Sequence, residues 1–260
     1  MRVGEQDLRN FINWGLKMIV FISIDDTDNL EQGSTGQTAN GLRKLVEEKG
    51  WGSTAPVTRH QLLVHPDIPY TSHNSAMCFK AELDPQVWED LIMAAGQYLE
   101  QRSAPGSDPG LCIVREDWIK NPAELLAFGY RAKREIITKE EAYQLAQRLR
   151  IHLSEHGGSG QGIIGALAGA GLRMSGNDGR FQGRLQLKAA GEIMTVEEIK
   201  RSSDIDSVET MDAYVLPETE EVVIGPVIKT VLLDHKRKLL VYRNQSDRWQ
   251  NCSKQQLRQY

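Results

Sequence analysis

The first candidates for chemistry in this sequence are three aspartates that follow an apolar stretch: Asp25, Asp26 and Asp28. Residues 18–24, just before them, are rich in apolar and β-branched side chains and predict a buried strand. If the chain stays extended, Asp26 and Asp28 project to one side and Asp25 to the other. Carboxylates so close together repel one another unless a cation or hydrogen-bond donors neutralise them. All three are therefore candidate magnesium ligands and candidate catalytic residues, with an ordinary acidic turn as the alternative.

A loop of small and hydroxyl-bearing residues separates the aspartates from a predicted amphipathic helix. The loop has the sequence GSTGQT over residues 33–38, and the helix that follows it stops at Gly50. The free N–H groups at a helix N-terminus bind anions. Carboxylates facing such a loop predict a joint seat for Mg²⁺ and phosphate, with Ser34 as a phosphate-binding candidate.

A glycine-rich segment, HGGSGQGIIGALAGAG over residues 156–171, is the second landmark. It contains the spacing G-x-G-x-x-G, but a predicted helix rather than a strand precedes it, which excludes a Rossmann dinucleotide site. No Walker lysine follows, so it is not a P-loop. Glycines let backbone N–H groups approach an anion, and they also permit close helix packing. The candidate cofactor-binding residues here are Gly158, Gly160, Gly162 and Gly165, and we expect the helix start near residue 162 to share one cleft with the aspartates.

Two further loops carry candidate substrate-binding residues. In the proline-containing loop 65–74, a ring from Tyr70 would stack on a base, while His73 and Asn74 would hydrogen-bond a base or ribose. The alternative is a stiff surface loop without a ligand. The turn at residues 106–110 contributes Asp108, which would join the metal site if this turn folds back over the first strand.

The order of predicted elements indicates an α+β protein in several parts. Residues 18–117 predict strand, helix, strand, strand, helix, strand, the split βαβ or ferredoxin-like arrangement. Residues 118–212 predict a helical part that contains the glycine loop, and residues 213–260 predict a small β module. Residues 1–17 form either a short native helix or a leader ahead of the first strand.

Composition limits the classes of function. The three cysteines include no CxxC pair, which excludes a zinc ribbon built by this chain and favours a reducing, cytoplasmic setting. No apolar run reaches membrane-spanning length, so no membrane partner is expected. The net charge of −4 gives no support to nucleic-acid binding through bulk charge, which leaves only a local basic patch for that purpose.

The sequence resembles the archaeal agmatidine synthase family. The resemblance begins with IDDTDN at residues 24–29, continues through the glycine segment at 160–168, and extends over about residues 18–212. Members of that family are ATP-dependent and modify a wobble cytidine of an isoleucine tRNA. The resemblance therefore implies ATP and Mg²⁺ as cofactors and tRNA or another RNA as a partner.

The resemblance also implies roles for particular residues. It assigns Gly160, Gly162 and Gly165 to a kinase-like α/β part that binds the nucleotide. A threonine after the aspartates handles phosphate in the family, and Thr35 is the nearest match in this longer loop, with Thr38 and Ser34 as further candidates. The family continues with an OB-fold and a zinc ribbon, for which residues 213–260 offer one cysteine and little length.

Three functions are consistent with these features. The first is an ATP- and Mg²⁺-dependent enzyme that activates a cytidine-like carbonyl oxygen in RNA for substitution by an amine. The second is also phosphoryl transfer, but to a small metabolite or another RNA, and the negative net charge of the chain favours it. The third is a non-enzymatic nucleotide- or RNA-binding protein whose aspartates hold a structural ion.

Overall fold

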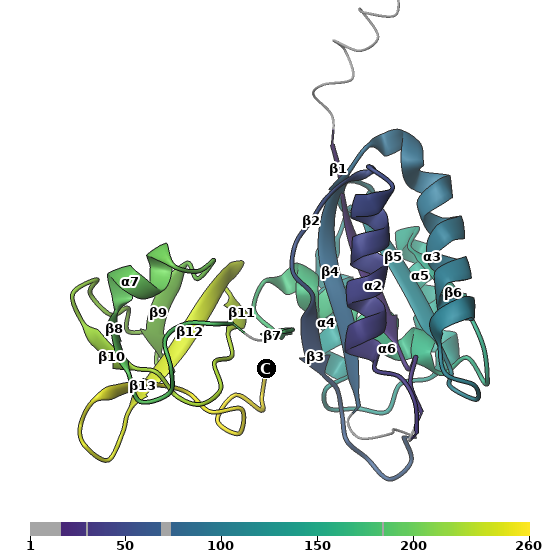
Figure 1. Ribbon diagram of the computed structural model, residues 1–260. Coiled ribbons are helices and arrows are strands. Elements are labelled where there is room, and N and C mark those ends of the chain that lie inside the picture. Colours follow the sequence, from purple (N-terminus) through teal and green to yellow (C-terminus); the bar gives the residue numbers. More distant parts are fainter. Residues whose placement is uncertain (1–16, 30, 69–73, 184) are drawn as a thin grey trace, which may run out of the picture.

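The computed structural model describes residues 17–29, 31–68, 74–183 and 185–260. They form an α+β protein in which one mostly antiparallel sheet runs through two lobes (Figure 1). Within the described ranges, no helix is both long enough and apolar enough to span a membrane. The three cysteines are buried and unbridged.

The larger lobe is built on four strands in the order β5–β1–β4–β3, and each neighbouring pair is antiparallel. Two short strands extend it, because β2 pairs with β4 and β6 pairs with β5. The bounds are β1 (Met18–Asp25), β2 (Gly52–Thr54), β3 (Thr58–Gln61), β4 (Ser75–Leu83), β5 (Gly110–Arg115) and β6 (His152–Glu155). The strand predicted at residues 18–24 is therefore confirmed, and it lies at the centre of the sheet.

Two helices, α2 (Thr35–Glu48) and α3 (Trp88–Arg102), cover one face of this sheet (Figure 1). The apolar stripe of α2 packs on the sheet through Ala39, Leu42 and Val46. The helix ends where its sequence predicts, since Gly50 takes a left-handed φ of 68° just beyond it. Single 3-10 turns precede α3 and follow β5, at Pro85–Val87 and Glu116–Trp118.

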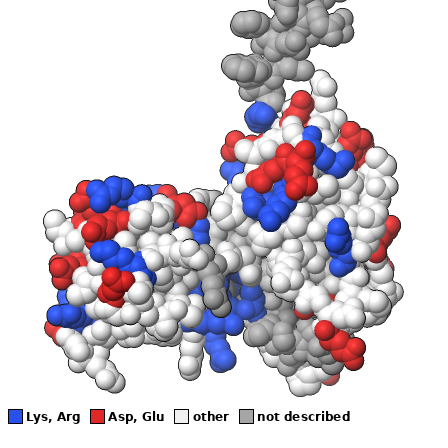
Figure 2. All heavy atoms as spheres, viewed as in Figure 1, with Lys and Arg blue, Asp and Glu red and all other residues white. Residues whose placement is uncertain are grey.

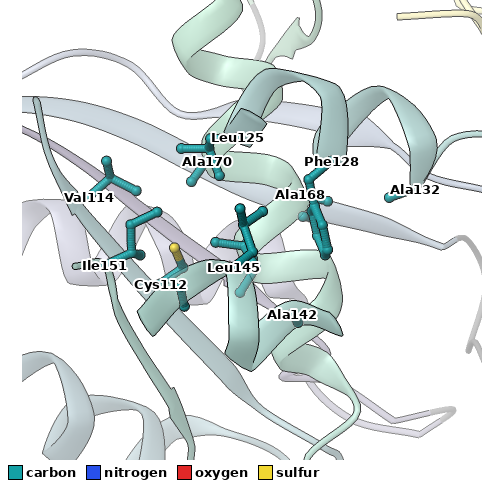
Figure 3. Packing of buried hydrophobic residues seen from close by; sticks show 14 of the residues in the cluster. Cys112, Val114, Leu125, Phe128, Ala132, Ala142, Leu145, Ile151, Ala168 and Ala170 are labelled. Carbon is teal, nitrogen blue, oxygen red and sulfur yellow. The ribbon is translucent and has the colours of Figure 1, made fainter. Parts of the chain in front are cut away.

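The opposite face is covered by α4 (Pro122–Arg131), α5 (Lys139–Leu149) and α6 (Gly162–Ser175). Figure 3 shows Leu125 and Phe128 of α4 close to Ala168 and Ala170 of α6. The small residues of α6 permit this packing, because a Cβ at Gly169 would press on Ser23 and Ala76 of the sheet. The close-packing role expected for the glycine segment is therefore confirmed.

The smaller lobe continues the same sheet. Its first strand, β7, pairs with β3 of the larger lobe and with β11, so the two lobes share a continuous ladder. Two of its pairs are parallel, β9 with β12 and β10 with β13. The bounds are β7 (Arg180–Phe181), β8 (Ile193–Thr195), α7 (Val196–Arg201), β9 (Ser207–Thr210), β10 (Glu221–Val223), β11 (Val231–Leu233), β12 (Lys236–Arg243) and β13 (Trp249–Asn251). A separate apolar core that includes Ile199, Val208 and Leu239 supports it.

Candidate functional site

A cleft of about 770 Å³ lies where β1 ends and β4 begins. The first turn of α2 lines one side of it with Ser34, Thr35 and Gly36, and the start of α6 lines another with Gly162 and Gly165. All three aspartates of the cluster also line it. The sequence-based expectation that the acidic strand end and the glycine-lined helix start share one cleft is confirmed.

Asp25 is the last residue of β1, and its carboxylate faces the start of α6. The side chain is buried, and a Cβ at Gly165 would overlap its Oδ2 atom, so only glycine leaves room for it. Burial raises the pKa of Asp25 to about 8, and the neighbouring charge of Asp26 adds to the effect. Without a ligand, Asp25 is therefore largely protonated at neutral pH.

Asp26 is the point at which the chain leaves the extended conformation. Its φ of 52° is left-handed, and its N–H donates to Oδ1 of Asp25 over 2.9 Å. Burial raises the pKa of Asp26 to about 6, followed by the charges of Asp108 and Asp28. The alternation predicted from an extended chain therefore does not continue beyond Asp25, because the backbone turns at the next residue.

Asp28 is linked to the first residue of α2. The Thr35 hydroxyl donates to Oδ1 of Asp28 over 2.7 Å, and the N–H of Thr27 donates to the Thr35 hydroxyl oxygen over 3.4 Å. Ser34 occupies the N-cap position but makes no side-chain capping bond, and the first turn of α2 carries no acidic side chain. The N-terminus of α2 therefore lines the cleft, with the Asp28 carboxylate bound to the hydroxyl of its first residue.

The three carboxylates have different neighbours, since Asp25 faces α6, Asp26 faces Asp108 and Asp28 binds Thr35. No group of three or more His, Cys, Asp or Glu side chains is arranged to hold a metal in the part of the chain that the structure describes. Mg²⁺ is usually bound by one or two carboxylates together with substrate phosphates and water. The oxygen donors of this cleft fit such a partial ligand set and do not form a complete protein cage.

The glycine segment reaches the cleft through only part of its length. Gly162 and Gly165 line the cleft, whereas Gly158 and Gly160 lie outside its lining. The N–H of Gly162 donates to the carbonyl oxygen of Asp108 over 3.1 Å, and a Cβ there would overlap that oxygen. Gly158 and Gly160 take left-handed conformations, and they pack closely against Asp108 and Glu155 respectively.

Among the candidate substrate-binding residues, Asp108 and Asn74 line the cleft. The turn that carries Asp108 folds back toward the end of β1, and its carboxylate accepts hydrogen bonds from the N–H and the hydroxyl of Ser159. Asn74 uses its amide to donate to the carbonyl oxygen of Leu63 over 2.6 Å. Tyr70 and His73 lie outside the described residues.

Comparison with known proteins identifies relatives that match part of the chain. No protein-family model matches. An uncharacterized protein of Methanocaldococcus jannaschii is 32% identical over 154 residues, which is 59% of this chain and 49% of the relative. A structure described as a tRNA fluorescent labeling enzyme is 28% identical with a TM-score of 0.52, covering 59% of this chain and 36% of that one.

Two further solved structures are of TiaS, a tRNA agmatidine synthetase. Its apo form is 25% identical with a TM-score of 0.51, over 59% of this chain and 35% of TiaS. Its complex with tRNA and ATP shares the fold at 24% identity and a TM-score of 0.53, over 78% of this chain and 50% of TiaS. This chain resembles TiaS. The chain spans half or less of the length of the relatives it matches.

Two basic residues of the cleft, Arg59 and Lys139, were missed by sequence reasoning. Arg59 of β3 is buried, and burial followed by the charge of Arg180 lowers its pKa to about 10. Lys139 at the start of α5 contacts Oε1 of Glu155 at 2.6 Å and donates to the carbonyl oxygen of Ser159 over 2.7 Å. Arg59 falls within one of the strands predicted over residues 18–117, and a charged side chain in a strand was the signal that could have revealed it.

Apolar side chains, which we call the apolar wall, complete the lining of the cleft. The wall carries Leu62, Ile136, Ile137 and Ile164, of which Ile136 is 49% exposed. The N-terminus of α5 meets this wall at Thr138, where a capping box fixes the helix start. The cleft therefore combines carboxylates, helix N-termini and a flat apolar surface of the kind that accepts a ring.

Proposed function

We propose that this protein is an ATP- and Mg²⁺-dependent enzyme that activates a cytidine-like carbonyl oxygen in RNA for substitution by an amine. The observation that carries the proposal is the shared cleft, in which the acidic end of β1 meets the N-termini of α2 and α6. Solved complexes of TiaS contain tRNA with ATP, or tRNA with AMPCPP and agmatine, and they support the same assignment for this chain.

The aspartates would bind Mg²⁺, and the residues at the start of α2 would bind phosphate. Asp26 and Asp28 would hold Mg²⁺ from the strand side, with Asp25 behind them as a buried third carboxylate. When bound, ATP with Mg²⁺ supplies a transferable phosphoryl group whose negative charge is neutralised. The N–H groups at the start of α2, together with Ser34, would hold phosphate oxygens. Asp28 would accept the hydrogen bond of the Thr35 hydroxyl over 2.7 Å and so hold its oxygen beside the same phosphate group.

The glycines and the remaining cleft residues would serve the nucleotide and the substrate. Gly162 and Gly165 would present the N-terminus of α6, while Gly158 and Gly160 would shape the loop that leads to it. Asp108 and Asn74 would contact the substrate from the rim, together with Tyr70 and His73, which precede Asn74 in the same loop. The apolar wall would exclude water from the base.

We also propose how the chain is divided among these tasks. A ferredoxin-like part over residues 18–117 would carry the acidic site, and its support is the strand order β5–β1–β4–β3. A kinase-like part over residues 118–212 would supply the glycine loop, and residues 213–260 would form a β module beside it. Three buried, unbridged cysteines favour a reducing, cytoplasmic setting.

A second candidate function is phosphoryl transfer to a small metabolite or another RNA, and the net charge of −4 favours it. A third is nucleotide or RNA binding without catalysis. The three functions are separated by their products: transfer of labelled phosphate to tRNA, transfer to free nucleosides or metabolites, or binding without turnover.

The deciding experiment is Mg²⁺-dependent ATP turnover in the wild-type protein and in Asp26→Asn. Asn tolerates the left-handed backbone at this position, so the variant removes charge without adding strain. Asp67→Asn is the matched control, because Asp67 lines the same cleft but has a mostly exposed side chain. We expect turnover to be lost in Asp26→Asn and kept in Asp67→Asn. Turnover that survives in Asp26→Asn would contradict the proposal.

A further inference from the structure

Two buried arginines face each other across the pair of strands that joins the lobes. Arg59 of β3 is the direct antiparallel partner of Arg180 of β7. Side chains of directly opposite residues project to the same face of a sheet, and like charges in that position are destabilising. Both residues are buried, at 8% and 6% exposure. Backbone pairing of β3 with β7 does not require two guanidinium groups at this position, and their repulsion lowers the stability of the sheet.

Neither arginine has a countercharge among the described residues, because no carboxylate there forms an ion pair with either guanidinium group. Arg59 donates from Nε to Ser75 Oγ over 2.9 Å and from a terminal nitrogen to Gln61 Oε1 over 3.0 Å. Arg180 donates to the carbonyl oxygen of Lys254 over 3.3 Å. These acceptors are neutral, so two positive charges remain uncompensated in a largely buried position.

Arg59 lines the cleft at the end where β3 meets β7, whereas Arg180 lies outside the lining, where it contacts Lys254 and senses the charge of Arg258. Arg59 lines the cleft together with Gln182, which follows β7 and whose Oε1 packs against Gly36 in the first turn of α2. Figure 1 places β3 and β7 at the junction of the lobes, and Figure 2 shows Lys and Arg side chains gathered along the lower edge of that junction. An anion held there would lie beside the amide end of α2.

We propose that Arg59 forms a phosphate-binding seat at the β3–β7 end of the cleft, with Arg180 across the strand pair adding positive charge to it. A guanidinium group binds two phosphate oxygens at once, and a phosphate bound to Arg59 would offset the repulsion between the two arginines. The inference rests on the proposed function for the source of the phosphate, which is either the polyphosphate of a nucleotide or a phosphodiester of RNA. No covalent step is assigned to the two arginines.

The test uses the full chain with two probes, inorganic tripolyphosphate and a short single-stranded RNA, and measures each dissociation constant by calorimetry. We expect Arg59→Met and Arg180→Met each to weaken one of the two probes about tenfold or more. Loss of tripolyphosphate binding would identify a nucleotide phosphate as the occupant, and loss of RNA binding would identify a phosphodiester. Arg148→Met, which removes one positive charge outside the cleft, should leave both constants unchanged.

Ligand-free stability separates a binding role from a structural one. Removing one of two facing buried charges should keep or raise the melting temperature of Arg59→Met, whereas a purely structural arginine would lower it. Arg59→Lys, which keeps the charge but loses the planar fork, should fold and still bind the affected probe more weakly. The seat is disproved if Arg59→Met changes neither constant, or if the wild-type protein binds neither probe.

The outcome for the seat is distinct from the outcome for the proposed function. ATP turnover that persists together with unchanged phosphate and RNA affinities in both arginine variants would remove the seat alone. If the wild-type protein shows no ATP turnover but Arg59→Met loses affinity for phosphate, the proposed function is contradicted and the phosphate-binding seat is supported.

Discussion

Replacing Asp25 by Asn should stabilise the ligand-free protein while abolishing its proposed activity. The carboxylate is buried at the end of β1, beside two other aspartates and against the start of α6. Asn has the same shape and no charge, so it preserves the contact with Gly165 and removes the repulsion. A residue that costs stability when it is charged is expected where a ligand cation later neutralises it.

The magnitude follows from the pKa of Asp25, which burial raises from 3.8 to about 8. Each pH unit of difference corresponds to about 1.4 kcal/mol, so the full penalty is at most about 6 kcal/mol. Water entry and side-chain movement reduce it, and we expect about 2 kcal/mol. Because the folded pKa is the higher one, the penalty is absent below pH 3.8, grows as the pH rises and is complete above about pH 8.

The assay is urea unfolding of the wild type and Asp25→Asn between about pH 4.5 and 8.5, without Mg²⁺ or nucleotide. The free energy of unfolding of the variant should exceed that of the wild type by an amount that increases with pH. Asp67→Asn, at the rim of the same cleft, should change the free energy of unfolding by much less, because its side chain is mostly exposed. A variant that is less stable than the wild type at pH 8, or a difference independent of pH, would refute the reasoning.

Three further substitutions test other contacts of the cleft. Gly165→Ala places a Cβ on Asp25 Oδ2 and should lower the free energy of unfolding by about 1–3 kcal/mol, as measured in urea. Thr35→Val removes the hydroxyl that donates to Asp28 and should reduce ATP turnover while the melting temperature changes little. Thr138→Ala breaks the capping box of α5 and should cost about 1 kcal/mol in the same unfolding assay, with a larger loss if the apolar wall shifts with the helix.

The central strand and its helix could be predicted because their signals are local. Residues 18–24 read as a buried strand and lie at the centre of the sheet, and the stop signal at Gly50 matches the end of α2. The shared cleft could also be predicted, since the aspartates end a strand and Gly162 begins a helix. The loop after a strand and the loop before a helix that packs on the same sheet both lie at the end of that sheet, so their polar residues can meet there.

The detailed arrangement of the site depends on tertiary structure and could not be predicted. The alternation rule assumes an extended chain, and the left-handed φ of Asp26 ends it one residue after the strand. Arg59 and Arg180 lie far apart in the sequence, so only the register of β3 against β7 makes them partners. Gly158 and Gly160 were expected to contact the cofactor, whereas in the structure they pack against Asp108 and Glu155.

Charge is segregated within the cleft, which explains why the net charge of −4 is a poor guide to what the protein binds. The aspartates lie at the end of β1, and Arg59 lies two strands away on β3, with the amide end of α2 nearby. A simple anion would leave the carboxylates repelling one another, and a simple cation would leave the arginines uncompensated. A magnesium–phosphate complex neutralises both ends at once, so it should raise the melting temperature more than the sum of the increases that Mg²⁺ and phosphate each produce alone.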